Sequence, residues 1–125
     1  MLKNKILVLV VSIIYSTLLV YLTFGNVHSI VPDTNLEFQD KIFHFLAYSG
    51  LSFLWCYYSF LIQIKKGSLK VFLATFFFGI ISEFLQEKIN PMRHFDVIDL
   101  IANCLGVMFG TIIVVFGFKI RKLKY

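Results

Sequence analysis

Apolar segments long enough to cross a lipid bilayer occupy most of this chain. The run from Ile6 to Phe24 holds nineteen residues without a charged side chain, and three further apolar-dominated runs follow at about 41–64, 69–86 and 97–118. A helix of nineteen residues is roughly 28 Å long, close to the thickness of the hydrocarbon core. Because a segment inside lipid must satisfy its own backbone hydrogen bonds, the sequence predicts an all-α protein with four spanning helices.

The composition favours one membrane domain over a soluble protein. The 125 residues leave room for a single domain, 1–125, and 58% of them are hydrophobic. The third run has a short connection at each end, which predicts an antiparallel four-helix bundle. The net charge of +5 would suggest nucleic acid in a soluble chain. Here the bases lie at helix ends, where topology explains them, so we expect no nucleic-acid partner.

The basic residues gather at one end of the predicted bundle. That end collects nine of the twelve bases and no acid: Lys3, Lys5, Lys65, Lys66, Lys70, Lys119, Arg121, Lys122 and Lys124. The other end holds Lys41, Lys88 and Arg93 together with all seven acids and all three histidines. The positive-inside rule therefore predicts that both termini are cytoplasmic and that the acidic end faces outward.

Polar side chains recur at helical spacing on three of the four predicted helices. They are Lys41, His44, Tyr48 and Ser52 on the second, Gly79, Glu83 and Gln86 on the third, and Asp99, Asn103, Gly106 and Gly110 on the fourth. Residues three or four apart share one helix face, so these polar faces are expected to meet inside the bundle. The Gly106–Gly110 pair is a small-xxx-small motif that lets another helix approach closely.

The polar end predicts a ligand-binding site. Its candidate residues are Lys41, His44, Tyr48, Glu83, Gln86, Arg93, Asp96, Asp99 and Asn103. A carboxylate at the bilayer centre costs roughly 2.5–3.5 kcal/mol, so an acid such as Glu83 has either partners or a function. Lys41 and Arg93 suit an anionic group, whereas Glu83, Asp99 and His44 are the candidates for proton transfer.

Several of these residues also have a purely structural interpretation. Glu83 could pair with Arg93 or Lys41, and Asn103 could simply join two helices. Asp40 and Asp96 each precede an apolar run and suit helix caps. A metal site is conceivable from five side chains, namely His44, His94, Glu83, Asp96 and Asp99. Because they come from three segments without a compact ligand motif, the sequence predicts no metal and no cofactor.

Three motifs in this order resemble the VanZ-like family of small membrane proteins. They are D-K-x-x-H-F-x-x-Y from Asp40 to Tyr48, S-E-x-x-Q from Ser82 to Gln86, and R-x-x-D-x-x-D-x-x-x-N-x-x-G-x-x-x-G from Arg93 to Gly110. The founding member of the family is associated with resistance to the glycopeptide teicoplanin. The resemblance implies a multi-pass protein of the bacterial inner (cytoplasmic) membrane with a role in the cell envelope, and it implies no defined reaction.

Three functions remain open at this level. The first is a site that binds or modifies an outer-leaflet envelope component, such as an anionic lipid headgroup or a lipid-linked precursor. The second is a non-catalytic membrane protein whose polar residues only lock the helices together. The third is a small transporter, which the sequence favours least because the polar groups gather at one end and not near the midplane.

Overall fold

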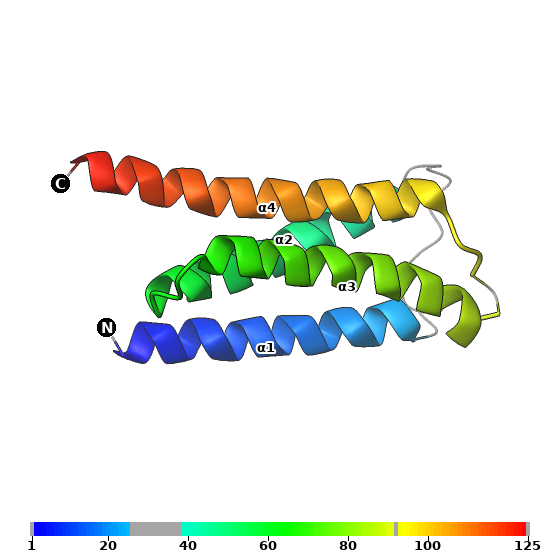
Figure 1. Cartoon of the computed structure of the whole chain (residues 1–125). Helices are drawn as coiled ribbons and strands as arrows, with labels where there is room; N and C mark the ends of the chain where they lie inside the picture. Colours follow the sequence, from blue (N-terminus) through cyan, green and yellow to red (C-terminus); the bar gives the residue numbers. More distant parts are fainter. Residues whose placement is uncertain (1, 26–38, 92, 125) are drawn as a thin grey trace.

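Four helices run side by side in the computed structural model, which describes residues 2–25, 39–91 and 93–124 (Figure 1). They are α1 (Leu2–Phe24), α2 (Gln39–Leu61), α3 (Gly67–Ile89) and α4 (Val97–Lys124). Successive helices run in opposite directions, so the start of α1 and the end of α4 lie at the same end of the bundle. The predicted all-α antiparallel bundle is confirmed. The first connector, with its proposed turn residues Pro32 and Asp33, lies outside the described residues.

The helix ends differ from the predicted ones by a few residues. Asp40 was expected to cap α2, but α2 begins at Gln39, so Asp40 lies inside its first turn. An acid at that position still stabilises the positive end of the helix dipole. At the same end of the bundle, α3 runs to Ile89 and not to about Gln86, and its last turn is closed by a hydrogen bond from the Asn90 N–H to the Gln86 carbonyl at 3.0 Å.

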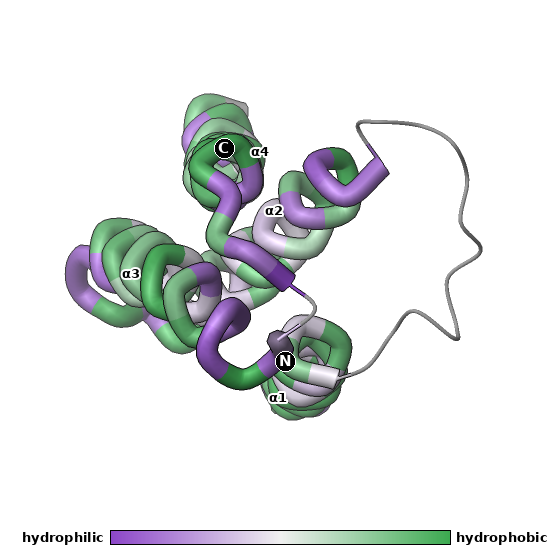
Figure 2. Tube along the Cα trace, turned by 90° about the vertical axis from the view of Figure 1, so that its right-hand side faces the viewer, coloured by the Kyte–Doolittle hydropathy of each residue, from purple (hydrophilic) through white to green (hydrophobic). Residues whose placement is uncertain are grey.

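The central helix of the bundle is α2, which packs against all three others and most extensively against α4. Figure 2 looks along the bundle and shows α1 and α4 on opposite sides of it. Two side chains fasten α1 to α2 through hydrogen bonds. The Tyr15 hydroxyl donates to the Ala47 carbonyl at 2.7 Å, and the Trp55 indole N–H donates to Ser16 Oγ at 2.9 Å. The arrangement makes α2 the scaffold on which the other helices are positioned.

Large apolar side chains cover the outward faces of the bundle. Examples that are exposed in the isolated chain are Leu7, Ile14, Phe77, Ile81, Ile101, Phe109 and Ile113. By length and composition, α1, α3 and the Val97–Arg121 part of α4 suit a bilayer span. The helix α2 has the same length as α1 but is more polar. It buries Tyr48, Ser52 and Ser59 against the neighbouring helices. Lipid is the solvent that such an exterior requires, and the chain is a multi-pass membrane protein.

The closest approach in the bundle is between α2 and α4. A side chain at Gly106 would collide with the carbonyl oxygen of Phe45, and one at Gly110 with the carbonyl oxygen of Ser49. Glycine is therefore required at both positions for the two backbones to touch. Across the same contact, Ser52 Oγ donates to the Val107 carbonyl at 3.1 Å. This tight contact places the start of α4 directly beside the start of α2.

Candidate functional site

Six polar side chains from three helices meet at the end of the bundle opposite the termini. We call this set the polar cluster: Lys41 and His44 from α2, Glu83 from α3, and Asp96, Asp99 and Asn103 at the start of α4. The start of α2, the end of α3 and the start of α4 adjoin there (Figure 1). The helical spacing of polar residues in the sequence predicted that the polar faces of these three helices would meet.

Asp96 begins α4 as its cap, as predicted. Its Oδ1 accepts a hydrogen bond from the Ile98 N–H at 2.9 Å, which satisfies one of the free donors of the first turn. That bond, and after it the ammonium of Lys41, holds the pKa of the Asp96 carboxyl below its ordinary value. Asp96 is therefore an anion at neutral pH, and its side chain stays partly exposed at the surface of the bundle.

Lys41 pairs with both aspartates at the start of α4. Its Nζ lies 3.2 Å from Asp96 Oδ2 and 3.5 Å from Asp99 Oδ1. Only the first contact also meets the geometry of a hydrogen bond, and Asp99 Oδ1 is buried without one. The ammonium thus joins α2 to α4 across the mouth of the bundle. It does not pair with Glu83, which the sequence had offered as a possible partner.

His44 lies between an amide and a carboxylate of α4. Its Nδ1 is 2.9 Å from Asn103 Oδ1, and its Nε2 is 3.8 Å from Asp99 Oδ2. Asn103 in turn directs its Nδ2 at the Gly79 carbonyl, 3.4 Å away. Because a carbonyl only accepts, this contact orients the amide so that Oδ1 faces His44. The Nδ1 atom is therefore the donor, and Nε2 faces Asp99, with a lone pair when the ring is neutral and with a proton when it is charged.

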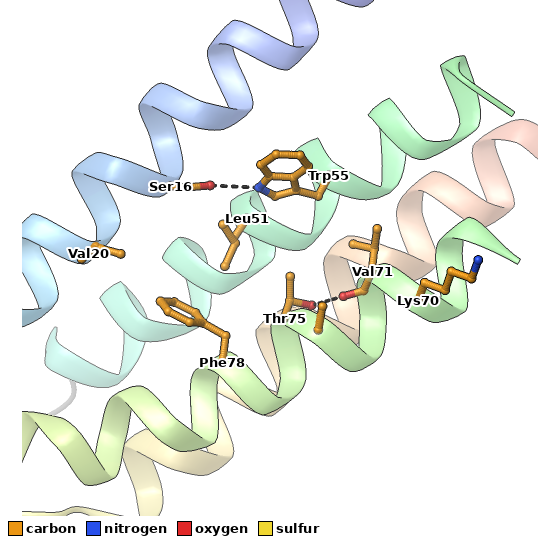
Figure 3. Close-up of a pocket in the computed structure, with 9 residues that line it drawn as sticks. Ser16, Val20, Leu51, Trp55, Lys70, Val71, Thr75 and Phe78 are labelled. Atoms are coloured by element: carbon orange, nitrogen blue, oxygen red, sulfur yellow. Dashed lines mark hydrogen bonds between the residues drawn. The ribbon is translucent and has the colours of Figure 1, made fainter. Parts of the chain in front are cut away.

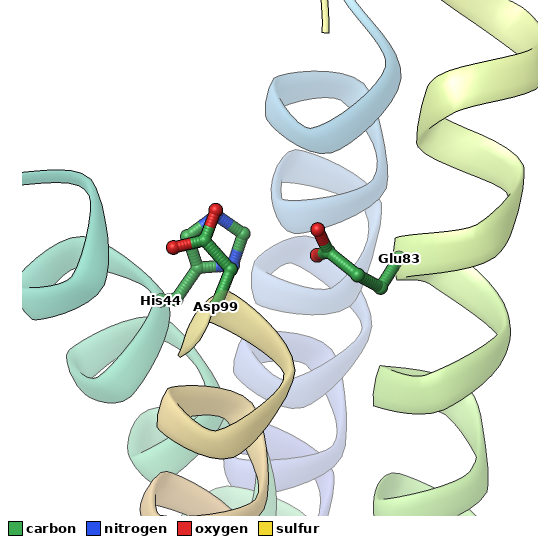
Figure 4. A group of neighbouring side chains, drawn as sticks. All are labelled: His44, Glu83 and Asp99. Atoms are coloured by element: carbon green, nitrogen blue, oxygen red, sulfur yellow. The ribbon is translucent and has the colours of Figure 1, made fainter. Parts of the chain in front are cut away.

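Glu83 is a buried carboxylate without an ion pair in the described part of the chain. Glu83 as a whole is only 2% exposed. Oε1 accepts a hydrogen bond from the Asp96 N–H at 3.3 Å, whereas no described group donates to Oε2, which is fully buried. Figure 4 shows the carboxylate reaching from α3 toward His44 and Asp99. One ligand atom from each of these three residues lies within 4.8 Å of the other two.

Tyr48 and Gln86 lie near the polar cluster but have other partners. The Tyr48 hydroxyl is 2.5 Å from Ser82 Oγ, and Ser82 gives its own proton to the Gly79 carbonyl at 3.0 Å, so Tyr48 is the donor. Gln86 turns toward α1, where its Nε2 donates to the Thr23 carbonyl at 3.0 Å. The candidate list had omitted Ser82, although it lies on the same face of α3 as Gly79 and Gln86 and is buried.

The connector between α3 and α4 carries the remaining candidate, Arg93. Its backbone N–H bonds to the Asn90 carbonyl at 3.0 Å, and its side chain is half-buried. Among residues 2–25, 39–91 and 93–124, the guanidinium forms no hydrogen bond and no ion pair. His94, the neighbouring residue, is exposed and lies outside the group formed by His44, Glu83 and Asp99. Within the part of the chain that the structure describes, Arg93 is thus a cation without a partner, three residues before Asp96.

The described residues also line a separate cavity of about 440 Å³ between α1, α2 and α3 (Figure 3). Its walls are Ser16, Val20, Leu51, Trp55, Lys70, Val71, Ala74, Thr75 and Phe78. Its three uncharged polar side chains already form hydrogen bonds, because Trp55 donates to Ser16, Ser16 donates to the Ser12 carbonyl, and Thr75 donates to the Val71 carbonyl. Lys70 is the single ionisable side chain among these walls. This cavity therefore offers few groups for chemistry.

The comparisons with known proteins give one family. A family model described as VanZ/LLP1 matches residues 7–118, which include α2, α3, most of α1 and α4, and every member of the polar cluster. No curated protein matches the chain significantly, and no solved structure does. The family match extends well beyond the three motifs, because it also takes in α1 and the turn between α2 and α3.

Proposed function

This chain belongs to the VanZ/LLP1 family of multi-pass membrane proteins, and on that premise we propose that its polar cluster binds the anionic headgroup of an envelope lipid or lipid-linked precursor. The observation that carries the proposal is the state of Arg93. A guanidinium with no partner among the described residues lies three residues before Asp96 of the polar cluster, and it can form two parallel bonds to a phosphate or carboxylate. Lys41 is less suited, because Asp96 and Asp99 already hold its ammonium.

The interior of the polar cluster supplies groups for chemistry on a bound headgroup. His44, Glu83 and Asp99 are within hydrogen-bonding reach of one small group placed between them. His44 Nε2 and Glu83 Oε2 have no proton to give in their neutral and ionised forms, so they suit the acceptance of a proton from a headgroup hydroxyl or amine. Asp99 completes the set as the carboxylate facing the imidazole.

The proposed site faces away from the cytoplasm. The end with nine bases carries the termini and the turn between α2 and α3, and the positive-inside rule assigns that end to the cytoplasmic side. The polar cluster would then meet the outer leaflet of the bacterial inner membrane. Its depth supports a headgroup ligand, because a group at the mouth of the bundle lies level with lipid headgroups. The association of the family with a glycopeptide antibiotic makes teicoplanin susceptibility a further readout.

Retention of lipid by the purified protein tests the proposal. The chain is reconstituted in nanodiscs containing phosphatidylglycerol and phosphatidylcholine, released into detergent, and analysed by native mass spectrometry. We expect preferential retention of phosphatidylglycerol, lost in Arg93→Gln and kept in Lys88→Gln, which removes an exposed charge near the same end. Equal retention of both lipids by the unmodified chain, or equal loss in both variants, would contradict the proposal.

One observation favours a second function, in which the polar cluster only locks the bundle. Lys41, Tyr48, Gln86 and Asn103 all bond to a neighbouring helix, as structural residues do. The two functions differ at Glu83, whose Oε2 contributes no bond to the described structure. A locking role predicts that Glu83→Gln lowers stability, and a binding role predicts that the variant folds normally but loses lipid retention.

A further inference from the structure

The geometry of the polar cluster points to a divalent metal ion, and we propose that His44, Glu83 and Asp99 bind Zn²⁺ or Mn²⁺. One imidazole and two carboxylates come from three different helices and converge on a common point (Figure 4). Imidazole and carboxylate together suit first-row transition ions, and carboxylate alone suits Mg²⁺ or Ca²⁺. No local sequence motif contains the three proposed ligands, because they are separated by 39 and 16 positions along the chain.

The first support is the orientation of the imidazole. Asn103 receives the Nδ1 proton of His44 and is itself held by the Gly79 carbonyl. In the neutral form of the ring, that arrangement leaves the lone pair of Nε2 directed at Asp99 Oδ2, 3.8 Å away. Two lone pairs facing each other repel unless a cation lies between them, and a metal ion can take that place as the proton of a charged imidazole would. Metal-bound histidines show the same pattern, in which the second ring nitrogen donates to a neighbouring oxygen that fixes the ring.

The second support is the buried oxygen of Glu83. Oε2 has no hydrogen-bond partner in the described chain, although the residue is almost fully enclosed by protein. A buried acceptor without a donor is costly, and an ionised one more so. Oε1 is held by the Asp96 N–H, which fixes the carboxylate, and the side chain reaches from α3 toward His44 and Asp99. A cation bound there removes the cost.

The balance of charge supports a divalent ion over a monovalent one. The polar cluster holds three carboxylates, from Glu83, Asp96 and Asp99, against the single ammonium of Lys41, which leaves an excess of two negative charges when His44 is neutral. The ligand atoms lie within 4.8 Å of one another. Two atoms bound to one tetrahedral Zn²⁺ at about 2.1 Å are about 3.4 Å apart, so binding would draw together side-chain atoms that now lie up to 4.8 Å apart by as much as about 1.4 Å.

Three protein ligands leave positions on the ion for a further group. In catalytic zinc sites a water or a substrate oxygen takes the open position. A phosphate held by Arg93 could bind the ion there through one of its oxygens. This last step rests on the proposed function, whereas binding of the ion itself needs only the three side chains.

Metal loading of the lipid-free protein in detergent tests the inference. The chain is stripped with a chelator, titrated with Zn²⁺ or Mn²⁺ against a competing fluorescent chelator, and analysed for metal per chain. We expect about one ion per chain, with affinity weakened about tenfold or more in Glu83→Gln and His44→Gln. The matched controls are Glu87→Gln and His94→Gln, which alter the same residue types at exposed positions of the same end and should bind like the parent.

A measurement on the unmodified chain keeps the test valid where a ligand variant fails to fold. Electron spin-echo spectroscopy of bound Mn²⁺ should show coupling to one imidazole nitrogen, retained in His94→Gln. Absence of loading, absence of the nitrogen coupling, or equal weakening in the matched controls would each overturn the metal site. Arg93→Gln separates the two proposals, because it should reduce lipid retention and leave Zn²⁺ and Mn²⁺ loading unchanged.

Discussion

The backbone N–H of Asp96 donates to the side chain of Glu83 at 3.3 Å, which joins the start of α4 to the end of α3. The bond uses Oε1 alone, and its donor is one of the free N–H groups that every helix start presents. Glu83 therefore has two separable parts. Oε1 holds the connector between α3 and α4 in place, whereas Oε2 takes no part in holding the described structure together.

Replacing Glu83 by glutamine should preserve the fold and remove the function. The amide oxygen of glutamine can accept the Asp96 N–H, and the substitution removes a buried charge that has no ion pair in the described chain. We expect the free energy of unfolding to stay within about 1 kcal/mol of the parent, or to rise. Thermal unfolding in detergent measures the stability, and lipid retention measures the function.

The opposite result would favour a locking role for the polar cluster. A fall in melting temperature by several degrees, together with normal lipid retention, would mean that the negative charge of Glu83 stabilises the bundle. Glu87→Gln is the matched control, because it removes the same charge from an exposed position one turn further along α3.

An alanine at Gly106 or Gly110 should destabilise the bundle. Its Cβ would collide with the backbone of α2 at Phe45 or Ser49, and backbone cannot move aside as a side-chain end can. Overpacking of this kind costs about 1–3 kcal/mol. Gly117 is the internal control, since a Cβ there meets nothing within 4 Å and alanine is a better helix former.

Thermal unfolding of the three glycine variants in one detergent checks this prediction. Gly106→Ala and Gly110→Ala should unfold at lower temperature than the parent, and Gly117→Ala should unfold at the same or a higher temperature. If all three variants behave alike, the close contact between α2 and α4 does not stabilise the protein.

Much of the fold follows from the sequence for simple physical reasons. A run such as Ile6–Phe24 has no alternative to a helix in lipid, so the four helices and their antiparallel order could be predicted. Helical spacing also predicted that Gly79, Glu83 and Gln86 share a buried face, and all three are buried. The cap at Asp96 was predictable as well, because an acid directly before an apolar run suits the first turn.

The partners of the polar side chains could not be predicted in the same way. Spacing places Lys41 and Glu83 at the same end, but the rotation of α2 against α4 decides that Lys41 pairs with Asp96 and Asp99. The close contacts of Gly106 and Gly110 with α2 set that rotation. These contacts form only when all the helices of the bundle are packed together. For the same reason the convergence of His44, Glu83 and Asp99 is visible only in three dimensions.

The orientation of the protein in the membrane is a separate prediction. Nine of the twelve bases lie at the end of the bundle that holds the termini, so both termini should be cytoplasmic. Fusions of alkaline phosphatase and green fluorescent protein after Asn26 and after Lys66 measure it. We expect phosphatase activity at the first site and fluorescence at the second. The reverse pattern would place the polar cluster on the cytoplasmic side and refute an outer-leaflet ligand.

The final prediction separates the two cations of the polar end. Arg93 has no partner among the described residues and is free to bind an anion, whereas the ammonium of Lys41 is shared between Asp96 and Asp99. A planar guanidinium makes two parallel bonds to a phosphate, which an ammonium cannot reproduce. Arg93→Lys should therefore weaken retention of phosphatidylglycerol several-fold, about 1 kcal/mol or more, although the charge is unchanged.

Lys41→Arg is the matched exchange in the other direction. A guanidinium at that position can still reach both aspartates, so stability and lipid retention should stay close to those of the parent. Native mass spectrometry of the two variants and the parent, at one ratio of lipid to protein, compares them directly. If Arg93→Lys retains phosphatidylglycerol like the parent, recognition does not use two parallel bonds. Arg93 would then only balance the acids around it, and the binding site would need another cation.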